Sequence, residues 1–145
     1  MRRPLAVFAL LAALPALCWI APLPARAATY PMAGAWFGTG QPDDRGEMYI
    51  DYFDADGAFH NHHRWCRQGK IAADIKETGR WSVAGDILTI DIATVDGRPA
   101  PRRDRYRLTS VDGKSQNYVV LPTNFPYHAR KVPASFAMPR CDLVG

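Results

Sequence analysis

The chain of 145 residues carries 18 basic and 14 acidic side chains, a formal net charge of +4. Three of the basic residues, Arg2, Arg3 and Arg26, lie in an N-terminal segment with the features of a signal peptide. The remaining residues hold 15 basic and 14 acidic side chains, so a basic nucleic-acid-binding surface is not indicated.

The N-terminal segment combines two arginines, an apolar run from Leu5 to Ile20 and the small-x-small sequence Ala25-Arg26-Ala27. This order predicts a signal peptide at residues 1–27 and one domain at residues 28–145, delivered to the periplasm or secreted. The apolar run is too short for a membrane span, and none is expected in the mature chain. Cys66 and Cys141 would then remain in an oxidising compartment, which predicts one disulfide.

The first part of the domain alternates short strand patterns with turn signals. Strands are expected at Ala33–Gly38, Glu47–Asp54 and Ala58–Arg67. The Asp54-Ala55-Asp56-Gly57 sequence between the last two is typical of a type I turn. Residues 68–75 are compatible with either a loop or the start of the next strand.

The clearest pattern runs from Gly79 to Ile92, where Gly85-Asp86 separates two alternating runs. A two-residue hairpin turn at this position pairs Ala84 with Ile87 and, at the far end, Gly79 with Ile92. One face of the predicted hairpin is then apolar and the other is polar. Pattern and turn chemistry therefore agree on one register.

After this hairpin, the prolines of Arg98–Arg103 predict a long connection. Strands are expected at Asp104–Ser110 and Ser115–Leu121, joined by a turn at Asp112-Gly113 that would pair Tyr106 with Val119. An eighth strand is expected at Pro126–Val132, followed by a tail at residues 133–145.

Turn signals recur about every ten residues, and no stretch has helical periodicity. The sequence therefore predicts an all-β domain, a single small antiparallel up-and-down β-barrel of about eight strands with one disulfide. A β-sandwich is the alternative.

Gly34-Ala35-Trp36 on the first strand resembles the Gly-x-Trp signature of lipocalins, and Arg130 stands where such barrels often pack an Arg against that Trp. The turn from Phe53 to Phe59 is also similar to turns in small bacterial lipocalin-like (calycin-type) periplasmic proteins. The resemblance implies a barrel that encloses a small, mostly apolar ligand. We also expect the protein to be a monomer.

The third strand, Phe59-His60-Asn61-His62-His63-Arg64-Trp65-Cys66, has two mixed faces. We expect the face with Asn61 and His63 to point inward, together with Tyr49 and Asp51 of the second strand and with Trp81 and Tyr106. These polar groups would either bind a ligand or only bond one another. The opposite face, with Met48, Ile50 and Cys66, would be covered by the C-terminal tail.

His60 and His62 lie two residues apart on one strand, a spacing that can present two imidazoles to zinc. His128 is the candidate third ligand, and no other cofactor is indicated. The alternative is a solvated strand face.

No nucleophile motif or phosphate-binding loop is present, so an enzyme is not expected. The first functional hypothesis is a non-enzymatic binding protein for a small molecule. The second is a protein-binding module, such as an inhibitor of an envelope hydrolase, and the third is the zinc binder.

Overall fold

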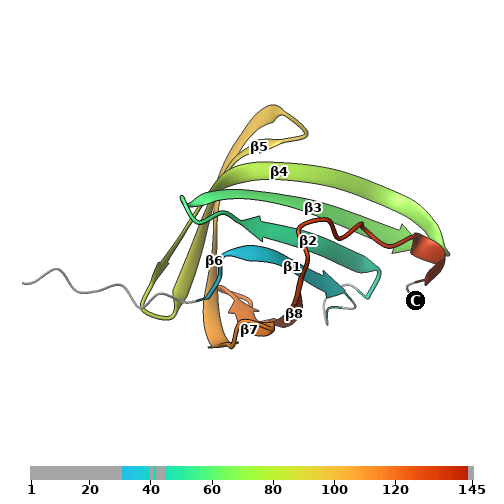
Figure 1. Cartoon of the computed structure of the whole chain (residues 1–145). Coiled ribbons are helices and arrows are strands. Elements are labelled where there is room, and N and C mark those ends of the chain that lie inside the picture. The colour runs from blue at the N-terminus through green and yellow to red at the C-terminus, as the bar shows by residue number, and fades with distance from the viewer. Residues whose placement is uncertain (1–30, 40, 42–44, 144–145) are drawn as a thin grey trace, which may run out of the picture.

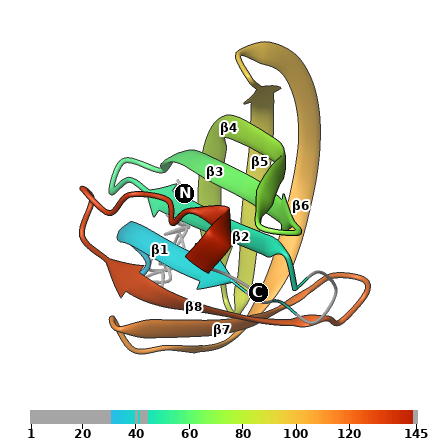
Figure 2. The same cartoon turned by 90° about the vertical axis from the view of Figure 1, so that its right-hand side faces the viewer.

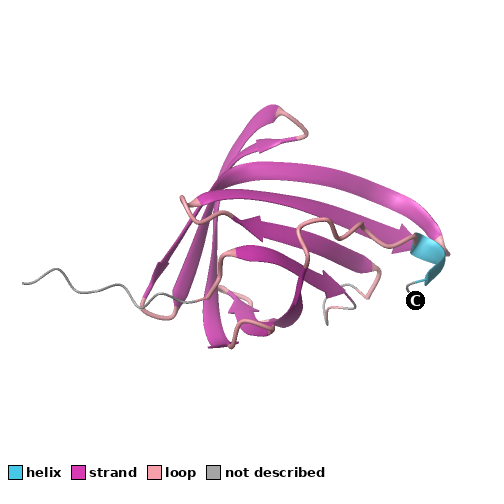
Figure 3. Ribbon diagram, viewed as in Figure 1, coloured by secondary structure: helices cyan, strands magenta, loops and turns pink. Residues whose placement is uncertain are grey.

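The computed structural model describes residues 31–39, 41 and 45–143, and the predicted signal peptide lies outside these residues (Figure 1). The regular secondary structure of the described residues consists of strands and a single turn of 3-10 helix, η1, at Cys141–Leu143 (Figure 3). The eight strands are β1 (Gly34–Thr39), β2 (Glu47–Phe53), β3 (Ala58–Arg67), β4 (Lys70–Ala84), β5 (Ile87–Val95), β6 (Arg98–Val111), β7 (Ser115–Val120) and β8 (Pro126–Val132).

The strands pair antiparallel in chain order, and β1 also pairs with β8 to close a barrel (Figure 2). The predicted fold class, an all-β eight-stranded barrel, is therefore confirmed. Closure leaves neither edge of the sheet unpaired. No helix among the described residues is long and apolar enough to cross a membrane.

The β4–β5 hairpin has the predicted register, from Ala84 opposite Ile87 to Gly79 opposite Ile92. The pairing shifts by one residue between Thr78 and Gly79, which marks a β-bulge. A Cβ atom added to Gly79 would lie 2.1 Å from the backbone oxygen of Asp91, so only glycine permits this approach. The uncertain segment at 68–75 belongs mostly to β4, which begins at Lys70.

The predicted connection at Arg98–Arg103 is wrong, because β6 already begins at Arg98. Pro99 lies opposite Thr94, and the β5–β6 register shifts between Ile92 and Thr94. Proline is tolerated in strands next to such irregularities. The correction matters for the site, because it places Arg102 on a barrel strand.

The predicted β6–β7 register is also wrong. Tyr106 lies opposite Val120, not Val119, and Leu108 lies opposite Tyr118. The carboxylate of Asp112 accepts hydrogen bonds from the backbone nitrogens of residues 114 and 115, which widens the expected two-residue turn. A further register shift follows Leu108. Tyr118 therefore enters the core in place of Val119.

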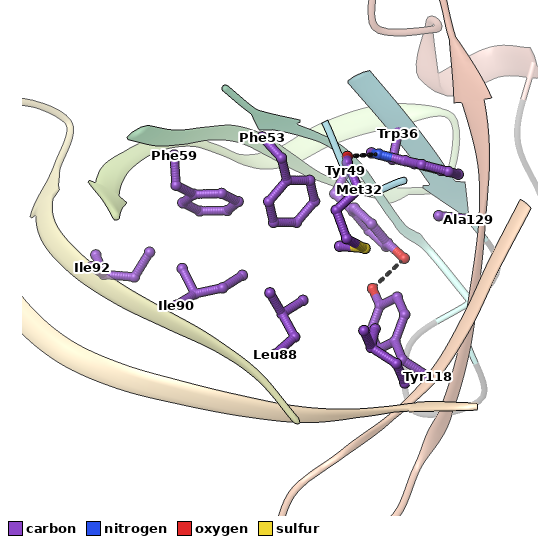
Figure 4. Close-up of a cluster of buried hydrophobic side chains, with 11 residues drawn as sticks. Met32, Trp36, Tyr49, Phe53, Phe59, Leu88, Ile90, Ile92, Tyr118 and Ala129 are labelled. Atoms are coloured by element: carbon purple, nitrogen blue, oxygen red, sulfur yellow. Dashed lines mark hydrogen bonds between the residues drawn. The ribbon is translucent and has the colours of Figure 1, made fainter. Parts of the chain in front are cut away.

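The barrel interior holds the main hydrophobic core. Figure 4 shows Phe59, Phe53 and Tyr49 from β3 and β2 facing Ile92, Ile90 and Leu88 from β5. The indole N–H of Trp36 donates to the backbone oxygen of Met32 at 2.7 Å. The core members are Met32, Trp36, Tyr49, Phe53, Phe59, Leu88, Ile90, Ile92, Leu108, Tyr118 and Ala129.

A second hydrophobic cluster covers the outside of β1 and β2, where the C-terminal tail crosses the sheet (Figure 2). Met48 and Ile50 are buried there, with Phe136 and Met138 of the tail packed against the cluster. The disulfide between Cys66 and Cys141 ties the tail to the end of β3, as predicted.

Arg130 does not pack against Trp36, as the lipocalin resemblance implied. Its guanidinium lies 5.2 Å from the ring centre of Phe37 and 5.0 Å from that of Phe136, on the outer face of the barrel. Lys131 lies opposite Trp36 in the β1–β8 pair and places its ammonium 5.3 Å from the indole ring. The neighbouring residue on β8 thus provides the cation, because strand alternation turns Arg130 outward.

The Cys66–Cys141 disulfide closes a loop with a sequence separation of 75 residues. In the chain-entropy relation, a disulfide that closes a loop of this length raises the unfolding free energy by about 4 kcal/mol. We expect Cys66→Ser to lower the unfolding free energy by up to that amount and to increase amide exchange first from Phe136 onward. Denaturant titration and hydrogen exchange measure these two effects.

Phe136→Ala with the disulfide intact is the control that separates packing of the tail from the covalent constraint. If Cys66→Ser left tail exchange unchanged, the tail would be held by packing alone, contrary to this expectation.

Candidate functional site

A cavity of about 250 Å³ lies inside the barrel, beside the hydrophobic core. Its walls combine apolar, aromatic and charged side chains from seven strands, β2 to β8, and from the loop that follows β7. The lining residues are Glu47, Tyr49, Asp51, Phe59, Asn61, His63, Glu77, Ile90, Ile92, Arg102, Arg103, Asp104, Arg105, Tyr106, Tyr118, Val120, Leu121 and Tyr127.

The β2–β3 pair brings four of the predicted polar residues together. Asp51 lies directly opposite Asn61, and Tyr49 lies opposite His63. All four side chains line the cavity, because alternate residues of each strand point to the same side of the sheet. Asn61 is only 6% exposed; its amide nitrogen donates to Glu77 at 3.1 Å, while its Oδ1 has no hydrogen-bond partner.

His63 forms the polar contact nearest the start of β2. Its Nδ1 lies 3.1 Å from Oε1 of Glu47, and its ring stacks on Tyr49 with a centroid distance of 5.4 Å. Burial lowers the pKa of His63, but the hydrogen bond to Glu47 and the charge of Asp51 raise that pKa to a net value above its ordinary one. His63 therefore binds a proton more readily than a free imidazole does.

Asp51 is the least compensated carboxyl group in the cavity. Burial raises the pKa of Asp51 from 3.8 to about 7, although the charge of His63 and the amide of Asn61 act in the opposite direction. Its carboxylate forms no ion pair with any described residue. The barrel thus holds one carboxyl group that changes its charge near neutral pH.

Three charged residues on the wall formed by β4 and β6 were not predicted as site residues from the sequence. Glu77 is 2% exposed and pairs with Arg102 at 2.6 Å, and Arg102 also contacts Asp104 at 3.0 Å. These carboxylates raise the pKa of Arg102, which stays charged. Arg102, Asp104 and Tyr106 are two residues apart from one another, so they lie on one face of a strand. This pattern was overlooked because the prolines before Arg102 suggested a loop.

Tyrosines form another wall of the cavity. The hydroxyls of Tyr49 and Tyr118 form a hydrogen bond (Figure 4), with the two oxygens 2.6 Å apart. The rings of Tyr106 and Tyr127 contact Tyr118. Burial raises the pKa of Tyr49, Tyr106 and Tyr118, so their hydroxyls remain protonated. A Cβ atom at Gly38 would lie 2.2 Å from the Tyr49 ring, so glycine makes room for this tyrosine.

Trp81, which was predicted to bind ligand, does not line the cavity. Its indole N–H donates to the backbone oxygen of Asp54 at 2.9 Å, and its ring meets Phe53 edge-on at 5.4 Å. Trp81 therefore packs beside the core and holds the β2–β3 turn.

The three candidate zinc ligands have other partners. His62 contacts Asp74, His60 stacks on Tyr52 at 4.4 Å, and Nδ1 of His128 lies 2.8 Å from Oδ1 of Asn117 on the adjacent strand β7. Within the described part of the chain, no group of three or more His, Cys, Asp or Glu side chains is placed to hold a metal ion. The zinc site remains a prediction from the sequence alone.

No protein-family model matches the sequence, and no curated protein matches it significantly. Among solved structures, the chain is similar to a lipocalin-like protein from Bacteroides uniformis, with a TM-score of 0.44 and 12% sequence identity. The match covers 70% of this chain and 99% of that one.

The raised pKa of Asp51 predicts that the protein loses stability as the pH rises. Between pH 3.8 and about 7, the folded state keeps a proton that the unfolded chain releases, so each pH unit lowers the unfolding free energy by up to about 1.4 kcal/mol. His63 acts in the same direction above its unfolded pKa of about 6.5. The pKa of Asp74 is lowered, so this group makes the protein more stable as the pH rises, but its effect lies at more acidic pH.

Denaturant unfolding at several pH values between 4.5 and 8 measures this slope. The Asp51→Asn variant should lose most of the slope below pH 6.5 and keep the part due to His63 above it. A wild-type stability that rises from pH 5 to 7 would contradict the assignment.

Proposed function

We propose that this protein binds a small organic molecule inside its barrel and does not catalyse a reaction. The observation that carries the proposal is the interior cavity of about 250 Å³, lined by polar groups that the fold does not fully pair. Buried polar groups normally have partners, so an acceptor such as Oδ1 of Asn61 is a site for a donor from a ligand.

The cavity dimensions and lining favour a particular kind of molecule. Its volume lies just below the range of roughly 300–1,000 Å³ that is usual for small-molecule sites, so the ligand is small. Phe59, Ile90 and Ile92 provide apolar contact, while Asp51 and Asn61 provide polar contact. The ligand therefore has an apolar body and a polar group, rather than the mostly apolar character that the resemblance implied.

The compartment is part of the same proposal. The signal-like sequence at residues 1–27 supports export, and a disulfide is typical of proteins in oxidising compartments. We expect the protein to bind its ligand as a monomer in the periplasm or after secretion.

Native mass spectrometry of the exported protein tests the proposal. The natural molecule should appear as added mass that is lost when the protein is denatured. His63→Leu, inside the barrel, should abolish the adduct because it replaces a polar side chain of the cavity lining with an apolar one. His60→Leu is the matched control, since His60 belongs to the same strand but is exposed on its other face, and this variant should keep the adduct.

A bare protein mass, together with a stoichiometric co-purifying protein, would contradict ligand binding. That result would instead favour the second functional hypothesis, a protein-binding module for an envelope protein.

A further inference from the structure

We propose that the ligand of the barrel is a small organic ammonium ion. This inference rests on the proposed function and specifies the ligand class of the same cavity. It follows from a surplus of carboxylates in the cavity wall, from an acceptor that lacks a donor and from a tyrosine-rich surface.

The first observation is the charge balance inside the barrel. Four acidic side chains line the cavity on inward-facing positions, but only two basic ones do, namely Glu47, Asp51, Glu77 and Asp104 against His63 and Arg102. Glu47 contacts His63, and Arg102 contacts both Glu77 and Asp104. The carboxyl group of Asp51 forms no direct ion pair with a described residue, although the charge of His63 acts on it. A ligand cation would complete the balance.

Two further arginines at the cavity wall do not supply this charge. Arg103 and Arg105 alternate with Arg102, Asp104 and Tyr106 along β6, so their side chains belong to the outer face of the strand. Arg103 is fixed there by two hydrogen bonds to Asp91, at 2.6 and 3.1 Å.

The second observation is the orientation of Asn61. Its Nδ2 donates to Glu77 at 3.1 Å, and its amide also stabilises the charged form of Asp51. Two carboxylates therefore fix which end of the amide carries hydrogens, and Oδ1 is left as a buried acceptor without a donor. An ammonium group offers up to three donors and can serve Asn61 and Asp51 together.

The third observation is the aromatic surface. Tyr49, Tyr106, Tyr118 and Tyr127 all line the cavity and contact one another. The faces of tyrosine rings attract organic cations through their quadrupole, most strongly where water is excluded. The same faces accept the apolar body of the ligand.

An anionic ligand fits this wall less well. Both inward basic groups, His63 and Arg102, already contact carboxylates. An added anion would compete with those carboxylates and meet the charge of Asp51. A neutral ligand would give the carboxylate of Asp51 no ion-pair partner.

Three probes with the same ring test the inference: benzylammonium, benzyl alcohol and benzoate. Each is titrated into the exported, dialysed protein at pH 8, where Asp51 is mostly ionised, with calorimetry for affinity and amide NMR shifts for location. Benzylammonium should bind at least about tenfold more tightly than benzyl alcohol, a difference of about 1.4 kcal/mol. Benzoate should bind more weakly than either.

Two Asp→Asn variants locate the charge that recognises the cation. Asp51→Asn should weaken benzylammonium binding by about tenfold or more, while it changes benzyl alcohol binding little. Asp91→Asn is the matched control, because Asp91 carries the same group on the outer face. Its affinity for benzylammonium should stay within about twofold of the wild type.

Several results would overturn the inference. Equal or tighter binding of benzyl alcohol or benzoate in the cavity would refute the cation but leave small-molecule binding intact. Failure of all three probes, with no natural adduct, would refute the proposed function as well. If Asp51→Asn does not fold, the three probes still test the inference on the wild-type protein, because they share one ring and differ in the charge that it carries.

Discussion

The pairing of β2 with β3 is the constraint on which the rest of the structure depends. It places Tyr49, Asp51, Asn61 and His63 inside the barrel and Met48 and Ile50 on the outside. A slip of one residue would exchange the two faces, because strand side chains alternate. Both faces of β2 are buried, the inner one by the opposite barrel wall and the outer one by the tail. The disulfide at Cys66 fixes the tail on the outer face and so helps to specify the register.

The two buried layers differ in chemistry. The outer layer is apolar, with Phe37, Ile50 and Phe136, and has the composition of an ordinary hydrophobic core. The inner layer mixes aromatic rings with the buried carboxyl groups of Asp51 and Glu77, and burial of such charges opposes folding unless they are paired. Apolar burial on the outside can offset that cost, which permits a polar interior in a small domain. A charged group retained where it destabilises the fold is a reason to look for function there.

The hairpin from Gly79 to Ile92 could be predicted to the residue, because turn chemistry and alternation specified the same register. The interior position of Asp51, Asn61 and His63 followed from pairing β3 with β2. The β6–β7 register could not be predicted, since it depends on hydrogen bonds from the Asp112 carboxylate and on a bulge after Leu108. Glu77 and Arg102 were missed because their strands begin earlier than turn signals and prolines indicated. Their ion pair depends on barrel closure, which short sequence patterns do not encode.

The barrel interior holds one carboxyl group, that of Asp51, that forms no ion pair with a described residue. The most direct measurement is a ¹³C NMR titration of the Asp51 side-chain carboxyl in the folded protein, with Asp51→Asn used to assign the resonance. We expect a midpoint of about 7 for Asp51, with His63 titrating above its ordinary value. A midpoint for Asp51 near 3.8 would mean that the carboxylate is already solvated or paired, which would contradict the surplus.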